Sequence, residues 1–478
     1  MKKIFFLFIF LGCICNLSRA QQVTFERYYD YGFAEAANAM QQTTDGGYII
    51  FGRQGIAIGV SKILLLKTDS FGIEQWHKLI GKNNADNYAY SGQQTSDGGY
   101  IMTGNTTGIV PSDYDVYLVK TDSNGDTLWS KQYGTSGPNM YDNGWCVKQT
   151  SDGGYIIACQ GPVAAWIIKT DSNGDSLWTK TFLPSGSNGS DLYSIQQTLD
   201  TGYIVTGTAN FSGTSNDIYL IKTDSLGDTL WTRTWGGAAW DRGQSVQQTS
   251  DTGYIVVGYT YSFGVGSYDV YLIKTDLNGD SLWTKTYGDV NENTGWSVRQ
   301  TTDGGYIIGG TTSIPTPLNY DVWLIKTNSA GDTLWTKKFG DNAGDQYAGY
   351  DGCVKQTSDG GYVICGLTAM GNAAAYVVKT DSSGNIIAAI PELNAPETFS
   401  VFPNPFCNSV SVNIPIEYLL YQNLNLTLCD MLGREIKSIK NIRAEKINLD
   451  LSNTDAGIYL VCIRSESRLI TSQKIIKQ

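Results

Sequence analysis

The sequence predicts an all-β protein: a seven-bladed β-propeller followed by a small immunoglobulin-like β-sandwich. Three observations favour this fold class: a unit of about 52 residues that occurs seven times, four strand-like runs in each unit, and a different sequence pattern over roughly the last eighty residues. The composition agrees, because Gly (54) and Tyr (30) are abundant and only 17% of the 478 residues are charged. A repeated four-strand unit of this length is typical of propeller blades.

Two motifs mark each repeat. Gln-Thr-x-Asp-x-Gly-Tyr is followed by Lys-Thr-(Asp/Asn)-x-x-Gly, and in six repeats a tryptophan comes shortly afterwards. The tyrosines of the first motif are Tyr48, Tyr100, Tyr155, Tyr203, Tyr254, Tyr306 and Tyr362. Seven copies at this spacing fill the region from Val23 to Ala388, so we expect the whole region to be one ring of repeats.

The fifth repeat illustrates the four strands. Residues 244–249, 253–259, 269–275 and 281–287 are rich in β-branched and aromatic side chains, and turn sequences separate them. Such runs predict strands joined by tight turns. Residues 24–29 match the fourth strand, which is incomplete in the seventh repeat. We therefore expect the N-terminal strand to complete blade 7 and close the ring, leaving no exposed sheet edge.

The N-terminus has the pattern of a secretory signal peptide. Lys2 and Lys3 precede an apolar run that ends at Ser18-Arg19-Ala20, which predicts cleavage after Ala20. Cys13 leaves open a lipoprotein alternative. No other apolar stretch approaches the ~18 residues of a membrane-spanning helix, so no transmembrane segment is predicted. The expected organisation is a signal peptide (1–20), a propeller (21–390), a linker (391–397) and a C-terminal domain (398–478).

The C-terminal domain contains three motifs in a fixed order. Phe402-Pro403-Asn404-Pro405 comes first, a segment with Gly433 follows, and Gly457 and Tyr459 belong to the last motif. These motifs resemble the type A C-terminal sorting domain of the Bacteroidetes type IX secretion (Por secretion) system. The resemblance implies handling by the type IX machinery, passage through the periplasm, and delivery to the cell surface or the extracellular space. An ordinary immunoglobulin-like binding module is the alternative.

The repeat unit resembles the bacterial β-propeller repeat family in Asp-Val-Tyr-Leu-Ile-Lys-Thr-Asp, Asn-Gly-Asp-x-Leu-Trp and Tyr-Gly. It is also similar to quinoprotein propellers in the Asp, Gly and Trp spacing near the last strand. Those enzymes usually have eight blades, and no cluster of quinone and calcium ligands is found once only here. We therefore predict no cofactor.

Charge and composition exclude several classes of function. The net charge of −11 and the pI near 4.7 disfavour nucleic acid, whose phosphates require a basic surface. The single histidine, His77, removes His-based metal clusters and most His-dependent triads. Loops such as Asp122–Asp126 resemble calcium loops but lack the sixth-position Gly and distal Glu of an EF-hand, and Asx-Gly is what a tight turn requires. We predict no metal site.

Positions that are constant in every repeat are expected to serve packing. The first motif always begins with Gln (Gln42 in the first repeat), which we expect to be a buried amide bonded to the backbone of the adjacent blade. Three residues earlier only Ala, Ser or Cys occurs, so that position should be crowded. Cys146 and Cys159 lie symmetrically about a turn, which leaves open a cross-strand disulfide.

Variable positions are the candidates for a binding site. In an up-and-down blade, the uniform turns lie on one face of the ring and the loops that differ in length and content lie on the other. The second face carries aromatic side chains accompanied by acids. We predict a ligand site formed by Tyr90, Trp145, Tyr193, Trp240, Trp296 and Tyr350.

Two classes of function follow from this pattern. The first is non-enzymatic binding of a glycan or a surface protein by the variable-loop face. The second is a polysaccharide hydrolase with two carboxylates about 5–10 Å apart, which would be a glycosidase. No acid stands out from the repeats as a unique pair, which favours binding, and no catalytic residue is predicted. A purely structural or adhesive surface role stays open.

Overall fold

The computed structural model describes residues 22–57, 60–107, 113–134, 141–211, 216–315, 318–340, 346–368, 373–386, 399–414, 424–430, 434–444, 446–465 and 468–478. The chain divides into two compact units, Met1–Ala388 and Ala389–Gln478, and each is described by itself. The expected signal peptide (1–20) and linker (391–397) lie outside the described residues. Over the described ranges the protein is all-β, and no helix long and apolar enough to span a membrane is found there.

The described part of the first unit forms seven antiparallel sheets, which we number as blades 1 to 7. Blades 1 and 2 consist of β2 (Glu35–Gln42), β3 (Tyr48–Ala57), β4 (Val60–Thr68), β5 (Glu74–Ile80), β6 (Asn87–Gln94), β7 (Tyr100–Thr107), β8 (Tyr114–Thr121) and β9 (Thr127–Tyr133). Blades 3 and 4 consist of β10 (Asn143–Gln149), β11 (Tyr155–Gln160), β12 (Ala165–Thr170), β13 (Ser176–Phe182), β14 (Ser187–Gln197), β15 (Tyr203–Phe211), β16 (Asn216–Thr223) and β17 (Thr229–Trp235).

The remaining blades follow the same plan. Blades 5 and 6 consist of β18 (Asp241–Gln248), β19 (Tyr254–Thr260), β20 (Asp269–Thr275), β21 (Ser281–Tyr287), β22 (Asn293–Gln300), β23 (Tyr306–Pro315), β24 (Leu318–Thr327) and β25 (Thr333–Phe339). Blade 7 consists of β26 (Gln346–Ala348), β27 (Val354–Gln356), β28 (Tyr362–Thr368), β29 (Ala375–Thr380) and β1 (Phe25–Tyr29). In the fifth repeat, the four predicted strands coincide closely with β18 to β21.

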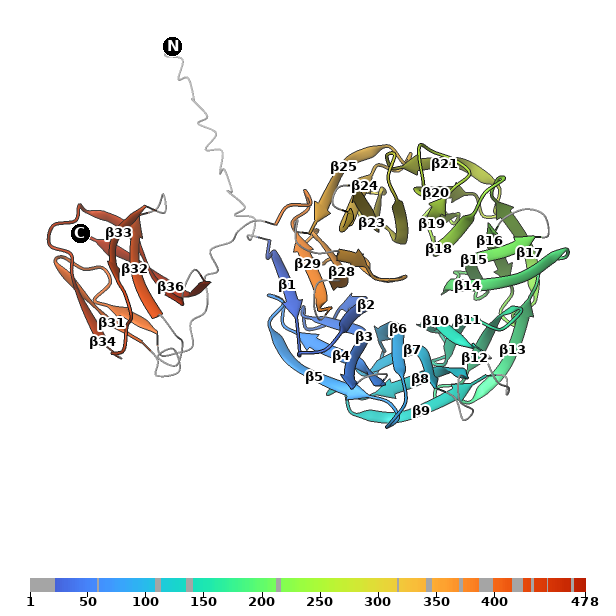
Figure 1. Ribbon diagram of the computed structural model, residues 1–478, viewed down its shortest axis with the longest axis horizontal. Helices are drawn as coiled ribbons and strands as arrows, with labels where there is room; N and C mark the ends of the chain where they lie inside the picture. Colours follow the sequence, from blue (N-terminus) through green and yellow to red (C-terminus); the bar gives the residue numbers. More distant parts are fainter. Residues whose placement is uncertain are drawn as a thin grey trace, which may run out of the picture. The chain divides into compact units, whose positions relative to one another are not determined.

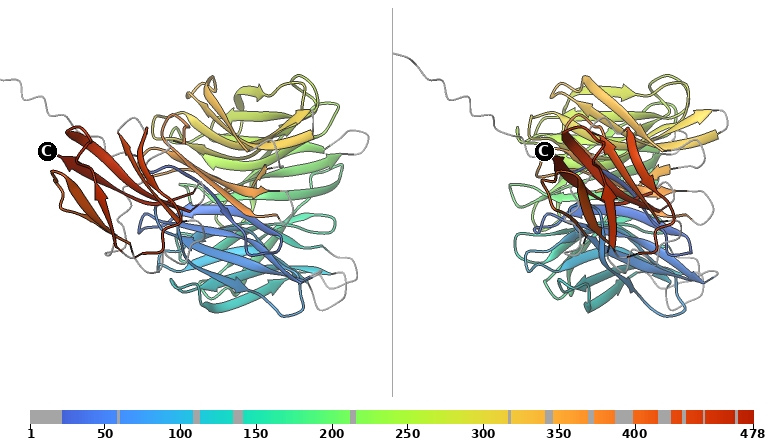
Figure 2. Two further views of the ribbon diagram at one scale, coloured as in Figure 1. Left: turned by 60° about the vertical axis from the view of Figure 1, so that its left-hand side comes forward. Right: turned by 90° about the vertical axis from the view of Figure 1, so that its left-hand side faces the viewer.

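The blades form a ring, with the first strand of each blade nearest the centre and the fourth at the rim (Figure 1). Residues of all seven blades line a cavity at the centre, and we call this central space the channel. Seen from the side, the strands run between the two faces of the ring (Figure 2). We call the face with the uniform turns, such as 43–47 and 122–126, the turn face. The opposite face, with the second-to-third-strand loops and the blade-to-blade connections, is the loop face.

The two motifs of each repeat bind one another. In blade 1, Lys67 Nζ lies 2.8 Å from Asp45 Oδ2, so the lysine of the second motif pairs with the aspartate of the first. Thr43 and the backbone of Gly47 also donate hydrogen bonds to Asp45 Oδ1. The equivalent pairs, with distances of 2.8–3.0 Å, are Lys120–Asp97, Lys169–Asp152, Lys222–Asp200, Lys274–Asp251, Lys326–Asp303 and Lys379–Asp359.

The constant glutamine links neighbouring blades. Gln94 Oε1 accepts a hydrogen bond of 3.0 Å from the backbone N–H of Thr44 in blade 1, and the same bond recurs round the ring. It also joins blade 7 to blade 1, because Ser358 N–H donates to Gln42 Oε1 at 2.9 Å. The predicted bond to the adjacent backbone is confirmed. The predicted burial is wrong in degree, since these side chains are half-buried at the turn face.

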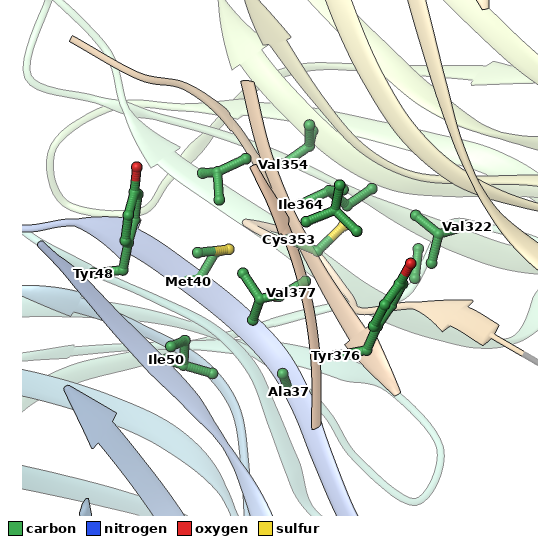
Figure 3. Packing of buried hydrophobic residues seen from close by; sticks show 14 of the residues in the cluster. Ala37, Met40, Tyr48, Ile50, Val322, Cys353, Val354, Ile364, Tyr376 and Val377 are labelled. Atoms are coloured by element: carbon green, nitrogen blue, oxygen red, sulfur yellow. The ribbon is translucent and has the colours of Figure 1, made fainter. Parts of the chain in front are cut away.

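The N-terminal strand lies at the rim of blade 7. β1 pairs antiparallel with β29, with Phe25 opposite Lys379. Between blade 7 and blade 1, a buried cluster joins Met40, Tyr48 and Ile50 to the side chains of β27 to β29 (Figure 3). This cluster is continuous across the junction between the beginning and the end of the repeat region, so the junction is packed like the inside of a domain.

The cysteines do not form the disulfide considered from the sequence. A β-bulge between Gly144 and Cys146 shifts the register, so Cys146 lies opposite Ala158 and Cys159 lies opposite Gly144. All seven described cysteines are free thiols. Cys146 and Cys353 occupy the small-residue position and are buried, as expected for a crowded site where the inner strands converge.

The second unit contains two sheets. One is formed by β30 (Ser400–Phe402), β31 (Ser409–Asn413) and β34 (Lys446–Asp450), and the other by β33 (Glu435–Ile439), β32 (Leu424–Asp430), β35 (Gly457–Ser465) and β36 (Arg468–Lys477). Apolar side chains from both sheets make one buried cluster, which is typical of a β-sandwich. The Phe402–Pro403 and Asn404–Pro405 peptide bonds are cis.

Candidate functional site

A β-bulge in the first strand of blades 1 to 6 places one side chain outside the strand pairing. In blade 2, for example, Ala89 lies opposite Gly104 and Ser91 opposite Thr103, which leaves Tyr90 without a partner in the ladder. The equivalent bulge residues are Asn38, Tyr90, Trp145, Tyr193, Gln244 and Trp296. Bulges re-aim side chains, and here the re-aimed position differs from blade to blade.

Blade 7 departs from this pattern. Two residues separate Gly295 from Val298 in blade 6, whereas five separate the equivalent Ala348 and Val354 in blade 7. The first strand is therefore divided into β26 and β27 by a longer excursion, residues 349–353. Tyr350 N–H donates to Asn38 O at 2.8 Å, and a Cβ on Gly349 would lie 2.3 Å from the same oxygen. Only glycine permits this close approach to blade 1.

Five of the six predicted site residues meet around Tyr350. Its ring lies edge-on to Tyr90, Trp145 and Trp296, with centroid distances of 5.5, 5.2 and 5.8 Å. Tyr90 stacks on Trp145 at 4.4 Å, and Trp145 contacts Tyr193 at 5.5 Å. We call these five residues the aromatic cluster. All five are half-buried, so they form the lining of the channel towards the loop face and are not core residues.

Trp240 does not join this cluster. Its side chain is 52% exposed, and its ring lies beside the Arg242 guanidinium at 6.0 Å. It belongs to the connection that precedes blade 5, where the bulge residue is the polar Gln244. A blade-to-blade loop positions it on the rim of the loop face, apart from the residues at the centre.

A cavity of about 360 Å³ adjoins the aromatic cluster between blades 3 and 4. Trp145 Nε1 donates to Gln160 Oε1 at 3.2 Å, and Tyr193 OH donates to Asp191 Oδ2 at 3.1 Å, so two cluster residues bind side chains of the cavity wall. The polar side chains that line it are Gln160, Asn188, Ser190, Asp191, Thr208, Asn210 and Asn216. The loop face therefore offers aromatic rings next to a wall rich in amides.

Burial dominates the electrostatics of this region. It raises the pKa of Tyr90, Tyr193 and Tyr350, so these phenols stay protonated as hydrogen-bond donors at neutral pH. Burial also raises the pKa of Asp191, against the opposing hydrogen bond from Tyr193.

Several acids that accompany the variable loops serve the loops themselves. Asp241 Oδ2 accepts from Gly237 N–H at 3.0 Å and from Ser262 Oγ at 2.6 Å, while Thr260 donates to its other oxygen. Glu292 accepts from Tyr320 OH at 2.9 Å. These contacts hold the connections before blades 5 and 6 in place.

The loops that resemble calcium loops are turns held by their own aspartate. Asp122 Oδ1 accepts from the backbone N–H groups of Asn124 and Asp126, each at 2.9 Å, which leaves this oxygen engaged in the turn. Within the described ranges, no group of three or more His, Cys, Asp or Glu side chains is placed to hold a metal ion.

Asp351 belongs to the excursion of blade 7, and its side chain lies in the centre of the channel. Its carboxylate is 3% exposed and accepts hydrogen bonds from Ser245 Oγ at 2.7 Å, Arg299 Nη2 at 2.9 Å and Ser194 Oγ at 3.1 Å. These partners come from blades 4, 5 and 6, so Asp351 bridges across the channel beneath Tyr350. The sequence placed this residue only among the loop acids, and it gave no indication that Arg299 and Lys148 would lie beside it.

In the second unit, the first motif contacts the last strand. Asn404 Nδ2 donates to Lys474 O at 2.8 Å, and Asn404 Oδ1 accepts from Ile476 N–H at 2.9 Å, so the first motif binds the last strand. Tyr459 OH donates to Asp455 O at 2.7 Å. Gly433 lies outside the described residues.

Residues 400–478 match the family model described as "Secretion system C-terminal sorting domain". The second unit is a secretion-system sorting domain. This match confirms the resemblance found in the sequence, and the sorting domain marks the chain for export by type IX secretion to the cell surface or the extracellular space.

Comparison with solved structures gives distant similarities. A protein of unknown function from Bacteroides caccae is 11% identical, with a TM-score of 0.39, over 64% of this chain and 94% of that chain. Prolyl oligopeptidase B from Galerina marginata is 10% identical, with a TM-score of 0.42, over 91% of this chain and 56% of that chain. No curated protein matches the sequence of this chain.

Proposed function

We propose that the exported propeller binds a glycan on its loop face, without hydrolysing it. The convergence of the aromatic cluster on Tyr350 carries this proposal. A scaffold that needed only packing would place the same side chain at every bulge, whereas Tyr90, Trp145, Tyr193 and Trp296 differ from Asn38 and Gln244 at the equivalent position. Half-buried rings on a rigid ring of blades offer flat apolar surface to a sugar.

The adjoining cavity supplies the polar part of such a site. Its volume of about 360 Å³ lies within the range of small-ligand pockets. Gln160, Asn210 and Asn216 present amide donors and acceptors, which match the hydroxyl groups of a sugar. Asn210 Nδ2 donates to Asn216 Oδ1 at 2.7 Å, so these two side chains are already oriented relative to each other.

The carboxylates favour binding over hydrolysis. A glycosidase of the usual kind needs two carboxyl groups on either side of the scissile bond. Among the described residues that line this cavity, Asp191 is the one carboxylate. Binding of a surface protein and a purely adhesive role are the other outcomes that the experiment below distinguishes.

A glycan and polysaccharide array probed with the purified protein tests the proposal, with release of reducing sugar measured in parallel. For a glycan that binds, the double variant Trp145→Ala/Trp296→Ala should weaken affinity about tenfold or more, since each aromatic contact contributes about 1 kcal/mol beyond area burial. Asn124→Ser on the turn face is the control. Asn210→Ala changes an exposed cavity residue and should weaken binding even if the double variant folds poorly.

Three results would contradict the proposal. Equal affinity in the Trp variant and the wild type would place the site elsewhere. New reducing ends would favour the hydrolase. If no glycan on the array binds and a surface protein binds saturably, the loop face would be assigned to protein recognition.

A further inference from the structure

A second cavity lies in the channel on the other side of Asp351, towards the turn face. Its volume is about 470 Å³. The residue immediately before the constant glutamine contributes to its wall in every blade, and these seven residues are Gln41, Gln93, Lys148, Gln196, Gln247, Arg299 and Lys355. Four blades thus supply an amide and three supply a cation at one position. We call this set the channel ring.

The cations of the channel ring exceed the negative charge beside them. Arg299 forms an ion pair of 2.9 Å with Asp351, and Lys148 Nζ lies 3.9 Å from the same carboxylate. The side chain of Lys355, in contrast, makes no ion pair or hydrogen bond with any described residue, although its backbone pairs with Val363. Three cations therefore face one carboxylate, which is 3% exposed and already bound by Ser194 and Ser245. In a chain with a net charge of −11, this is a local excess of positive charge.

The amides of the ring leave donors for a ligand. Gln41, Gln196 and Gln247 each use the side-chain oxygen to accept a backbone N–H of the next blade, at 2.7–2.8 Å. This bond uses the oxygen of each amide and leaves its NH₂ group, which is a donor. Cations and NH₂ groups on one wall provide charge-assisted hydrogen bonds for an anion.

We propose that this cavity binds a small oxyanion, a sulfate, phosphate or carboxylate group, between Lys148, Arg299 and Lys355. The anion enters from the turn face and neutralises the excess charge of the channel ring. The site is separate from the cavity beside the aromatic cluster, because the two cavities share no lining residue. Its ligand is therefore independent of the glycan proposed for the loop face.

Calorimetric titration with sodium sulfate at constant ionic strength tests the proposal. The variant Lys148→Gln/Lys355→Gln is well suited, because four blades already carry Gln at this position and the fold accommodates it. The wild type should bind one sulfate saturably, and the variant should lose about tenfold or more in affinity. Lys180→Gln/Lys285→Gln is the matched control, since it removes the same charge from exposed outer strands and should change affinity less than about twofold.

Further ligands identify the class of anion. Phosphate, acetate and galacturonate are compared with sulfate, and neutral galactose should not compete for the cavity. Absence of saturable binding by every anion overturns the proposal. An equal loss of affinity in the outer-strand control also overturns it, because the loss would then be explained by the change in net charge alone. The Trp145→Ala/Trp296→Ala variant should retain sulfate binding, which separates this test from the test of the loop face.

Lys355 adds a dependence on pH. Burial and the neighbouring cations Arg299 and Lys148 lower its pKa to about 7, while Asp351 and Cys146 act in the opposite direction. Below this pKa the lysine is charged and favours an anion, and above it the charge is lost. Sulfate keeps its own charge between pH 6 and 8.5, so its affinity should fall several-fold over that range in the wild type. Lys355→Gln alone should remove this dependence, and a flat profile in the wild type contradicts the assigned role of Lys355.

Discussion

Phe25 in the N-terminal strand packs edge-on against Tyr48 in blade 1, with their ring centroids 5.8 Å apart. At the other six blade interfaces, a tryptophan of the fourth strand contacts the equivalent tyrosine of the next blade at 5.6–6.1 Å. Tyr29 OH likewise donates to Gly72 O at 2.7 Å, as Tyr287 OH does to Gly331 O at 2.6 Å. The N-terminal strand thus reproduces at the closing interface the ring contact that joins the other blades, together with the hydroxyl bond found between blades 5 and 6.

Replacing Phe25 with alanine should destabilise the propeller strongly. The side chain is buried between blades 7 and 1, and truncation of a buried phenylalanine costs about 3–5 kcal/mol. Thermal unfolding of the purified protein measures the effect, with Trp240→Ala as the control because that side chain is 52% exposed. A Phe25→Ala melting temperature equal to that of the wild type would show that β1 does not hold the ring closed.

Loss of the Asp351 carboxylate should also destabilise the ring. Asp351→Ala leaves the Arg299 guanidinium in the channel without its anion, and breaking one side of a buried ion pair costs about 3–5 kcal/mol. Asp332→Ala, which removes an exposed surface pair with Lys285, should cost much less, because solvent screens that pair. Denaturant unfolding of both variants decides whether Asp351 stabilises the channel, and equal costs would contradict that role.

The seven Lys–Asp pairs should give the propeller a characteristic sensitivity to acid. Although burial opposes ionisation, hydrogen bonds from Lys67 and Thr43 lower the pKa of Asp45 to about 2, and the pKa values of Asp97, Asp152 and Asp303 are also lowered to about 2. In the unfolded chain the pKa of an aspartate is near 3.9. The stabilisation is therefore complete above about pH 4 and disappears as the pH falls towards 2.

A single substitution isolates one of these contributions. The difference in melting temperature between the wild type and Asp97→Asn should be largest near neutral pH and should shrink between pH 4 and pH 2. Asp332→Asn on an exposed pair provides the comparison. A difference that stays constant down to pH 2 would mean that the pairing of Asp97 with Lys120 does not depend on its charge.

Removal of the sorting domain should prevent delivery to the cell surface. A chain that ends before residue 398 should accumulate in the periplasm of its native host, because type IX export depends on the C-terminal domain. Cell fractionation and protease accessibility measure the location, and the full-length Asp332→Ala chain serves as the exported control. Efficient surface delivery of the truncated chain would refute the dependence.

The fold was predictable because every blade repeats the same local sequence features. Each copy carries its own turn glycine, its Lys–Asp pair and its interface tyrosine, so seven independent segments indicate one structure. The match of residues 24–29 to a fourth strand also indicated the position of β1, since Phe25 stands where the tryptophan would be. Four of the predicted site residues lie together for a related reason, because Tyr90, Trp145, Tyr193 and Trp296 occupy the same bulge position in their blades.

The features that escaped prediction depend on contacts between distant blades. Asp351 finds its partners on blades 3, 4, 5 and 6, and no local pattern encodes that convergence. The interval of 56 residues between Tyr306 and Tyr362, longer than the mean, was the available signal for the excursion in blade 7. Cys146 and Cys159 were misplaced because a bulge shifts their register by one residue, and a bulge of this kind leaves no trace in a hydrophobic pattern.

The position of β1 links closure of the ring to the order in which the chain is synthesised. Tyr376 OH donates to Glu26 across 350 residues of sequence. The first strand of the propeller, β1, can therefore pair only after β29, the last strand of the propeller, has been synthesised. The sorting domain is synthesised only after that last strand. A product of interrupted translation that lacks the closing partner of β1 therefore also lacks the export signal. Because the sorting domain follows the final blade, only chains in which every blade has been synthesised can be exported.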